Sequence, residues 1–320
     1  MLALGILLIA LGIAVLWVSA DPFVVAASRL AHRWGISPVL VGALVVGLGT
    51  SAPELLVSGL SAARGELAES IGNVVGSNTV NLSLVLGVAA LLAPVAGQVR
   101  VIRREGVLTL LAMAAVTYVV WDDTLTSQEG TALIVSMALA SVLLIFWSGR
   151  DHRAGLDNVE VDGVDATETY RAGRQLLIAL LSIIGVVSGA ALLVEGGKSV
   201  AEVYGLTGGF VGATIFALGT SLPELVTAIA AARRKANDLL IGNLLGSNLF
   251  NSLLVVGTAG VIGPGSIGER RISEHLFMLA VGGAVGIFGI TRNRFGRFEG
   301  VALLGGFGGF IYLVAQNATL

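Results

Sequence analysis

Two glutamates that each follow a proline lie in the middle of long apolar segments. Glu54 closes the sequence Gly-Thr-Ser-Ala-Pro-Glu, and 170 residues later Glu224 closes Gly-Thr-Ser-Leu-Pro-Glu. An acid at the centre of a membrane helix costs about 2.5–3.5 kcal/mol on insertion scales. No Lys, Arg or His lies within either motif to offset that cost. A repeated, unpaired acid of this kind indicates a functional site, and the simplest ligand for it is a cation.

Each proline also removes one backbone hydrogen bond. Pro53 has no amide hydrogen for the carbonyl of Gly49, and Pro223 has none for Gly219. We therefore expect both helices to bend or unwind here and to leave carbonyl oxygens that a cation could satisfy. The Thr-Ser pair lies four and three residues before each glutamate, a spacing that predicts both hydroxyls on the face of that carboxylate.

A polar stripe with a spacing of four residues follows each glutamate. It consists of Asn73, Ser77 and Asn81 in the first half and Asn243, Ser247 and Asn251 in the second. Taken alone, such a stripe is as typical of helix packing as of ion binding. Together with the glutamates, the Thr-Ser pairs and carbonyls near Gly47 and Ala217, it supplies only hard oxygen donors. Such donors favour Ca²⁺, which takes about 6–8 oxygen ligands, or Na⁺ over zinc or copper.

The composition is that of an integral membrane protein. Of 320 residues, 55% are hydrophobic and 12% are charged, and the mean hydropathy is +0.89, so a water-soluble surface could not be assembled. The absence of cysteine excludes disulfides and thiolate chemistry, and a net charge of −2 gives no reason to expect nucleic acid. We expect membrane lipid around the chain, no catalytic residue and no cofactor. No protein partner is indicated, and a monomer is consistent with the sequence.

Apolar segments of spanning length predict ten transmembrane helices. They lie near 2–28, 37–64, 69–94, 105–122, 127–148, 173–198, 206–234, 239–264, 273–291 and 297–316. No Lys or Arg precedes Arg29, so we expect the first segment to be a helix and not a cleaved signal peptide. A polar linker at 150–172 divides the chain into five-helix repeats at 1–149 and 173–320. Their most similar parts are about 37–94 and 206–264.

An odd number of crossings in each half predicts that the halves are inverted copies. If the N-terminus is outside the cytoplasm, fifteen of the 19 Lys and Arg residues fall in cytoplasmic loops. By the positive-inside rule, this bias predicts a cytoplasmic linker and two extracytoplasmic termini.

The paired Gly-Thr-Ser-x-Pro-Glu and Gly-Ser-Asn-x-x-Asn motifs resemble the two alpha-repeats of the calcium/cation antiporter superfamily, specifically the prokaryotic sodium/calcium exchangers. The resemblance covers nearly the whole chain. It implies a ten-helix protein of the cell membrane in which the first and sixth helices, near 2–28 and 173–198, slide across a rigid core. The ligands that it implies are Thr50, Ser51, Glu54, Ser77, Asn81, Thr220, Ser221, Glu224, Ser247 and Asn251, with main-chain oxygens at Gly47 and Ala217.

One residue departs from the pattern, because some exchangers carry an aspartate where this chain has Asn251. Two glutamates balance the charge of one Ca²⁺, so we expect an antiporter that exchanges Na⁺ for Ca²⁺. A proton/Ca²⁺ antiporter is the alternative, since two protons would neutralise the glutamates as well. A channel would need a continuous pore, and a membrane scaffold would not need two unpaired acids.

Overall fold

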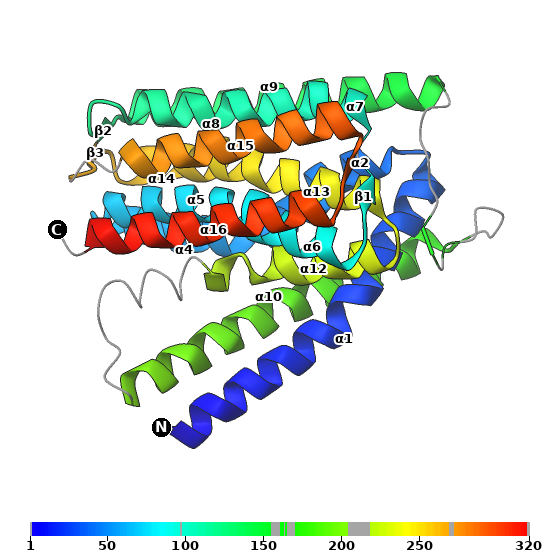
Figure 1. Cartoon of the computed structure of the whole chain (residues 1–320), viewed down its shortest axis with the longest axis horizontal. Coiled ribbons are helices and arrows are strands. Elements are labelled where there is room, and N and C mark those ends of the chain that lie inside the picture. Colours follow the sequence, from blue (N-terminus) through cyan, green and yellow to red (C-terminus); the bar gives the residue numbers. More distant parts are fainter. Residues whose placement is uncertain are drawn as a thin grey trace.

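The computed structural model describes residues 2–96, 98–154, 161–162, 164, 170–203, 218–268 and 272–318. Most of these residues are helical, and the helices form a bundle that two of them, α1 and α10, cross obliquely (Figure 1). The elements of the first half are α1 Leu2–Trp34, α2 Pro38–Leu40, η1 Val41–Val46, α3 Gly47–Thr50, α4 Ala52–Ala63, α5 Leu67–Val80, η2 Asn81–Val85, α6 Leu86–Leu92, β1 Val95–Ala96, α7 Val99–Val101, η3 Ile102–Gly106, α8 Val107–Val119, β2 Thr124–Leu125 and α9 Ser127–Arg153. Those of the second half are α10 Ala172–Val203, α12 Leu222–Arg233, α13 Asn237–Phe250, η4 Asn251–Val255, α14 Val256–Ile262, β3 Gly265–Ser266, α15 Ile272–Arg292, β4 Arg294–Phe295 and α16 Arg297–Ala318. Elements labelled η are π-helical.

Seven of the described helices are long and apolar enough to cross a membrane. They are Leu2–Trp34, Leu67–Leu92, Ser127–Asp151, Ala172–Val200, Asn237–Ile262, Ile272–Arg292 and Arg297–Asn317. Pro38–Thr50 and Ala52–Ala63, bent by 46° at their junction, make an eighth if they count as one span. Of the other two predicted spans, 105–122 corresponds to α8 and the end of η3, and much of 206–234 lies outside the described residues. The chain is a helical integral membrane protein, and the full count of ten stays a prediction.

Two spans form the centre of the bundle. In the most apolar 18-residue stretches of Leu67–Leu92 and Asn237–Ile262, 83% and 94% of the residues are buried, against 17–33% in the other spans. Glycine allows the second of them to approach its neighbour backbone to backbone. A Cβ at Gly242 would overlap the carbonyl of Val39, and one at Gly246 would overlap the backbone of Ala43. This contact places the polar stripe of α13 directly against η1 and α3.

The helices α1 and α10 pack against each other along most of their lengths (Figure 1). Their contact is also built on glycine. A Cβ on Gly12 would lie 2.7 Å from the carbonyl oxygen of Gly189, and one on Gly196 would lie 2.6 Å from that of Gly5. Side chains at these positions would force the helices apart, so the small residues allow α1 and α10 to form a pair.

Two short antiparallel strand pairs, which no sequence pattern predicted, join the halves. Strand β1 pairs with β4, and β2 pairs with β3. The two strand pairs are equivalent in the repeat. With the offset of 170 residues, β1 corresponds to β3 and β2 corresponds to β4, so the pair β1–β4 corresponds to the pair β3–β2. Strands of two residues are too short to show an alternating pattern, which is why no periodicity predicted them.

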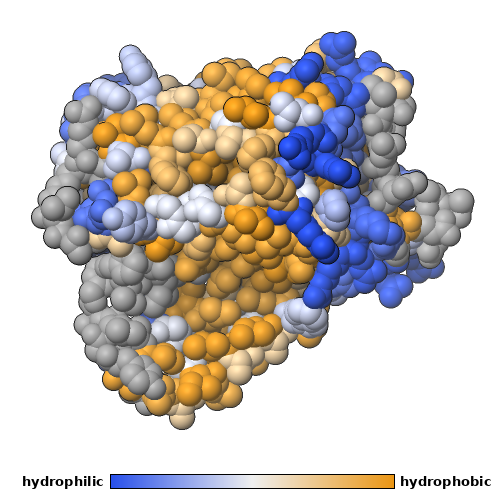
Figure 2. Space-filling model, viewed as in Figure 1, coloured by the Kyte–Doolittle hydropathy of each residue, from blue (hydrophilic) through white to orange (hydrophobic). Residues whose placement is uncertain are grey.

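One end of the molecule is strongly hydrophilic, while the middle is an apolar band (Figure 2). The ends of α1, α9 and α15 and the start of α16 lie on this side (Figure 1). Arg234 pairs here with Asp21 at 2.5 Å, and Lys235 pairs with Asp162 at 3.2 Å. Asp162 belongs to the linker predicted at 150–172, most of which lies outside the described residues. Its contact with Lys235 shows that the linker meets the end of α12.

Candidate cation-binding site

The two proline motifs break their helices as the sequence predicts. Helix α3 ends at Thr50, Ser51 adopts a turn conformation with φ −84° and ψ 6°, and α4 begins one residue before Pro53. In the second half Ser221 has nearly the same angles, −86° and 3°, before α12. The 46° bend measured in the first half confirms the prediction there. The break follows from the missing amide hydrogen of each proline.

Each break places a glutamate in the first turn of a new helix. Glu54 lies in the first turn of α4, and Glu224 lies in the first turn of α12. The partial positive charge at a helix N-terminus stabilises an acid there by about 0.3–1 kcal/mol, and by up to about 2 kcal/mol in a buried setting. This contribution offsets only part of the burial cost.

Both carboxylates are completely buried. Within the described residues, neither takes part in an ion pair. The hydroxyls of Ser77 and Thr220 face Glu54, yet neither of its carboxylate oxygens has a partner with hydrogen-bond geometry. Glu224 accepts one hydrogen bond, from Ser51 Oγ at 3.2 Å, and its second oxygen has none. The two acids are close enough to interact electrostatically, so together they form a buried centre of negative charge.

The hydroxyls of each half turn toward the other half. Thr50 Oγ1 lies 3.3 Å from Ser247 Oγ, and the equivalent pair, Thr220 Oγ1 and Ser77 Oγ, is also 3.3 Å apart. Ser51 donates to Glu224 and not to the glutamate of its own helix. The prediction that the hydroxyls of each Thr-Ser pair lie on the face of the carboxylate that follows does not hold for Thr50, Ser51 and Thr220, whose hydroxyl contacts are with the other half. The helical spacing on which it rested ends at the turn, and the hydroxyls point across the interface between the halves.

The asparagines at the end of each stripe begin the π-helical segments η2 and η4. Asn81 and Asn251 are completely buried, and among the described residues neither the amide nitrogen nor the carbonyl oxygen of either side chain has a hydrogen-bond partner. A buried amide without partners is costly and unusual in a native structure. Single π-helical turns occur frequently at functional sites. Both observations fit amide oxygens that serve as cation ligands.

Three other predicted ligands, Ser221, Gly47 and Ala217, differ in whether their oxygens already have a hydrogen-bond partner. Ser221 is buried, and its hydroxyl has no partner. The carbonyl of Gly47 already accepts the backbone N–H of Ser51 at 3.0 Å and lies 3.5 Å from Ser247 Oγ. Ala217 lies outside the described residues. The structure therefore brings Thr50, Ser51, Glu54, Ser77, Asn81, Thr220, Glu224, Ser247 and Asn251 into two stripes and two helix starts at the centre of the bundle.

Two buried hydroxyls behind this layer had no sequence signal of their own. Ser58 and Thr227 are buried hydroxyls on α4 and α12, and they hydrogen-bond to Asn73 and Asn243 of the polar stripes. A serine or threonine in an apolar helix is common, so its type alone carried no signal. Only the fold shows that these hydroxyls face the stripes.

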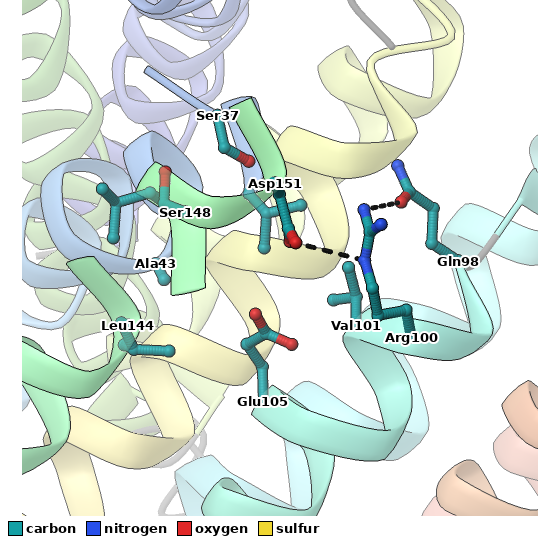
Figure 3. A pocket seen from close by; sticks show the side chains of 11 residues that line it. Ser37, Ala43, Gln98, Arg100, Val101, Glu105, Leu144, Ser148 and Asp151 are labelled. Carbon is teal, nitrogen blue, oxygen red and sulfur yellow. Dashed lines mark hydrogen bonds and ion pairs between the residues drawn. The ribbon is translucent and has the colours of Figure 1, made fainter. Parts of the chain in front are cut away.

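A polar cavity at the hydrophilic end of the bundle has a different chemistry from the central site. Its lining includes Ser37, Arg100, Glu105, Ser148 and Asp151 (Figure 3). Asp151 Oδ2 lies 3.4 Å from Arg100 Nε, so a guanidinium stands within the cavity. Arg104 also pairs with both Asp151 and Glu105, so the acids of this cavity are already neutralised, whereas the two central glutamates have no basic partner among the described residues.

The central donors do not form a conventional acidic cluster. Among the described residues, no group of three or more His, Asp or Glu side chains is placed to hold a metal ion. Two carboxylates with neutral amide and hydroxyl oxygens form a weaker field than three acids would. Such a site suits hard cations that must bind and leave again.

Comparison with known proteins identifies the same two halves. The family described as "Sodium/calcium exchanger protein" matches residues 4–147 and again residues 174–316. CaxA of Alkalimonas amylolytica, provisionally named an antiporter, is 34% identical over 312 residues, which span 96% of this chain and 97% of that protein. The sodium/calcium exchanger MaX1 of Methanosarcina acetivorans is 29% identical over 339 aligned positions, spanning 95% and 96% of the two chains.

A solved structure has the same fold. The sodium-calcium exchanger NCX_Mj, soaked with 10 mM Na⁺ and 10 mM Sr²⁺, superposes with a TM-score of 0.82 and 25% sequence identity. The superposition covers 98% of this chain and 99% of that one.

Proposed function

The chain belongs to the sodium/calcium exchanger protein family of the calcium/cation antiporter superfamily, and from this we propose that it exchanges Na⁺ for Ca²⁺ across the membrane by alternating access. The observation that carries the proposal is the pair Glu54 and Glu224, both completely buried without a basic partner. Two charges balance one Ca²⁺, and the same oxygens can accept Na⁺ in turn. The protein acts as a transporter and not as an enzyme, so Ca²⁺ and Na⁺ are its substrates and no cofactor is needed.

The proposed ligands are the oxygens at the helix starts and on the polar stripes. They comprise Thr50, Ser51, Glu54, Ser77, Asn81, Thr220, Ser221, Glu224, Ser247 and Asn251, with main-chain oxygens at Gly47 and Ala217. Their support is the burial of the described side chains and the unpartnered atoms of both asparagines. MaX1 is named a sodium/calcium exchanger, and NCX_Mj was soaked with Na⁺ and Sr²⁺, a heavier congener of Ca²⁺.

We further propose ten transmembrane helices arranged as two inverted repeats in a prokaryotic plasma membrane. Equivalent strand pairs and equivalent Thr-Ser contacts across the halves support this arrangement. The strongly hydrophilic end of the molecule (Figure 2), where Arg234 and Lys235 form ion pairs, supports a cytoplasmic linker with both termini outside.

Coupling to H⁺ is the alternative, because protons could neutralise the same two carboxylates. Na⁺ is favoured by the neutral hydroxyls that line the site, since Na⁺ needs several oxygens and a proton needs none. The test is uptake of radiolabelled Ca²⁺ into vesicles loaded with Na⁺, compared with acid-loaded vesicles free of Na⁺. Uptake driven only by the acid interior would replace Na⁺ with H⁺ as the coupling ion.

A further inference from the structure

Two asparagines outside the proposed ligand set connect the site to the helices behind it. Asn243 accepts a hydrogen bond from Thr50 Oγ1 at 3.2 Å, and Asn73 accepts one from Thr220 Oγ1 at 3.4 Å. Each amide therefore contacts a threonine of the opposite half. The amide nitrogens point the other way, toward Thr227 at 3.4 Å and Ser58 at 3.1 Å.

In the second half, the direction of these hydrogen bonds is fixed from the backbone outward. Thr227 Oγ1 lies 2.8 Å from the carbonyl oxygen of Pro223 and 3.0 Å from that of Glu224, and its single proton must go to one of them. Its oxygen can then only accept, which orients the amide nitrogen of Asn243 toward it. The carbonyl oxygen of Asn243 consequently faces Thr50. Of the oxygens within reach of the single Thr50 proton, that of Asn243 is the nearest at 3.2 Å, followed by Ser247 Oγ at 3.3 Å and the carbonyl of Gly47 at 3.4 Å.

The first half reaches the same direction through another hydroxyl. Ser58 donates to the backbone carbonyl of Ser70 at 3.3 Å and accepts from the amide nitrogen of Asn73. The carbonyl oxygen of Asn73 is thereby left to accept the proton of Thr220.

The two anchoring hydroxyls are not equivalent positions of the repeat. With the offset of 170 residues, Ser58 corresponds to Ala228, and Thr227 corresponds to Val57. A contact inherited passively from a duplication would use the same position in both halves. Two different positions instead produce the same orientation of the amide, so it is the orientation that the halves share.

We propose that Asn73 and Asn243 are positioning residues that turn the hydroxyl protons of Thr220 and Thr50 away from the glutamates. A hydroxyl has one proton and two lone pairs, so a threonine whose proton is engaged by an amide presents only lone pairs to an ion. Without the amide, the same proton can be donated to Glu54 or Glu224 in a charge-assisted hydrogen bond that competes with the cation. The identity of the ions rests on the proposed function, whereas the orientation rests on the geometry alone.

The direct test is cation binding to the purified protein in detergent, measured by calorimetric titration with CaCl₂ and with NaCl. Loss of an outer partner of a metal ligand typically weakens metal binding by about 10- to 100-fold, and we expect a weakening in this range for Asn73→Ala and Asn243→Ala. Thr79→Val is the matched control. Thr79 is buried on α5, and within the described part of the chain its hydroxyl bonds to the carbonyl of Val75 in its own helix and to no other group. Wild-type affinity in both asparagine variants would overturn the proposal.

A pair of changes at Thr227 separates positioning from packing. Thr227→Val keeps the side-chain shape and removes the hydroxyl, while Thr227→Ser keeps the hydroxyl and removes a methyl group. Positioning predicts several-fold weaker binding for the valine variant and near wild-type affinity for the serine variant. Packing predicts the reverse order, and that result would refute the role assigned to Asn243.

Binding also separates this proposal from the proposed function. If the wild type binds Ca²⁺ but Na⁺-loaded vesicles take up none, the proposal that the protein exchanges Na⁺ for Ca²⁺ is refuted. The ranking of the variants in the binding assay would still decide the role of the asparagines.

Discussion

Replacing one buried glutamate with glutamine should stop ion exchange and at the same time make the ion-free protein more stable. Glu54 has no hydrogen-bond partner for either oxygen and no ion pair within the described structure. Its charge therefore opposes folding unless a cation is bound. Glutamine has nearly the same shape and no charge, so Glu54→Gln removes the ion ligand and the burial cost together.

The size of the effect follows from the environment of each acid. An ionised acid at the centre of a membrane helix costs about 2.5–3.5 kcal/mol, and the N-terminus of α4 returns about 0.3–2 kcal/mol of that. Glu54→Gln should therefore raise the free energy of unfolding by about 1–3 kcal/mol. Glu224→Gln should gain about 1 kcal/mol less, because the hydrogen bond from Ser51 changes from a charged to a neutral acceptor.

Thermal unfolding in detergent without Ca²⁺ or Na⁺ measures this difference. With an unfolding entropy of about 2.1 cal/mol/K per residue, 1 kcal/mol corresponds to about 1.5 °C in a chain of this length. We expect Glu54→Gln to raise Tm by about 2–5 °C and Glu224→Gln by less. The gain should increase toward alkaline pH, because only the ionised acid carries the burial cost.

Addition of Ca²⁺ should make the wild type more stable than the two glutamine variants. At a concentration of 100 times Kd, a ligand stabilises the folded state by about 2.7 kcal/mol, and we expect this gain in the wild type but not in the variants. Glu66→Gln, at an exposed acid just before α5, is the matched control. It should change neither the Tm of the ion-free protein nor the stabilisation by Ca²⁺. A lower Tm for ion-free Glu54→Gln, or sustained Ca²⁺ flux in vesicles, would refute the assignment of Glu54.

Three further predictions concern topology, the α1–α10 contact and the charge of the site. In intact cells, Leu2→Cys should react with an impermeant maleimide while Asp157→Cys should not, and the opposite pattern would reverse the proposed orientation. Gly189→Ala should lower the free energy of unfolding by about 1–3 kcal/mol, because its Cβ would lie 3.0 Å from a carbonyl oxygen of α1, whereas Gly283→Ala, with no neighbour within 4 Å, should not. Asn251→Asp adds a third acid to the centre, so its Ca²⁺ uptake should fall more steeply than that of the wild type as pH decreases. Identical pH profiles would place residue 251 outside the ion cluster.

The sequence predicted most of the helices well because membrane-spanning segments leave a local signal. Apolar segments of membrane length located the starts of α1 and α10 to within one residue, whereas the two helices continue six and five residues beyond their predicted ends. Pro53 predicted a break, which appears as a 46° bend. The acids stood out because a charge within such a segment has few explanations.

The sequence could not predict which side chains meet across the halves. The helical spacing of Thr50, Ser51 and Glu54 placed all three on one face, but the turn at Ser51 ends the helix between them. The hydroxyls then face Ser247 and Glu224, which lie more than 170 positions away. A contact of this kind depends on how close α13 can approach η1, and that distance is set by Gly242 and Gly246.

The crossed arrangement links the proposed ion ligands of the two halves. Ser51 of one half contacts Glu224 of the other, and Thr220 pairs with Ser77 in the same crossed manner. A displacement of either half would therefore change the oxygens available to both acids. Without a cation the two carboxylates repel each other, whereas a cation bound between them attracts both. We infer that occupied and empty sites favour different relative positions of the helices that carry them, since a ligand shifts a conformational equilibrium only by its difference in affinity for the two states.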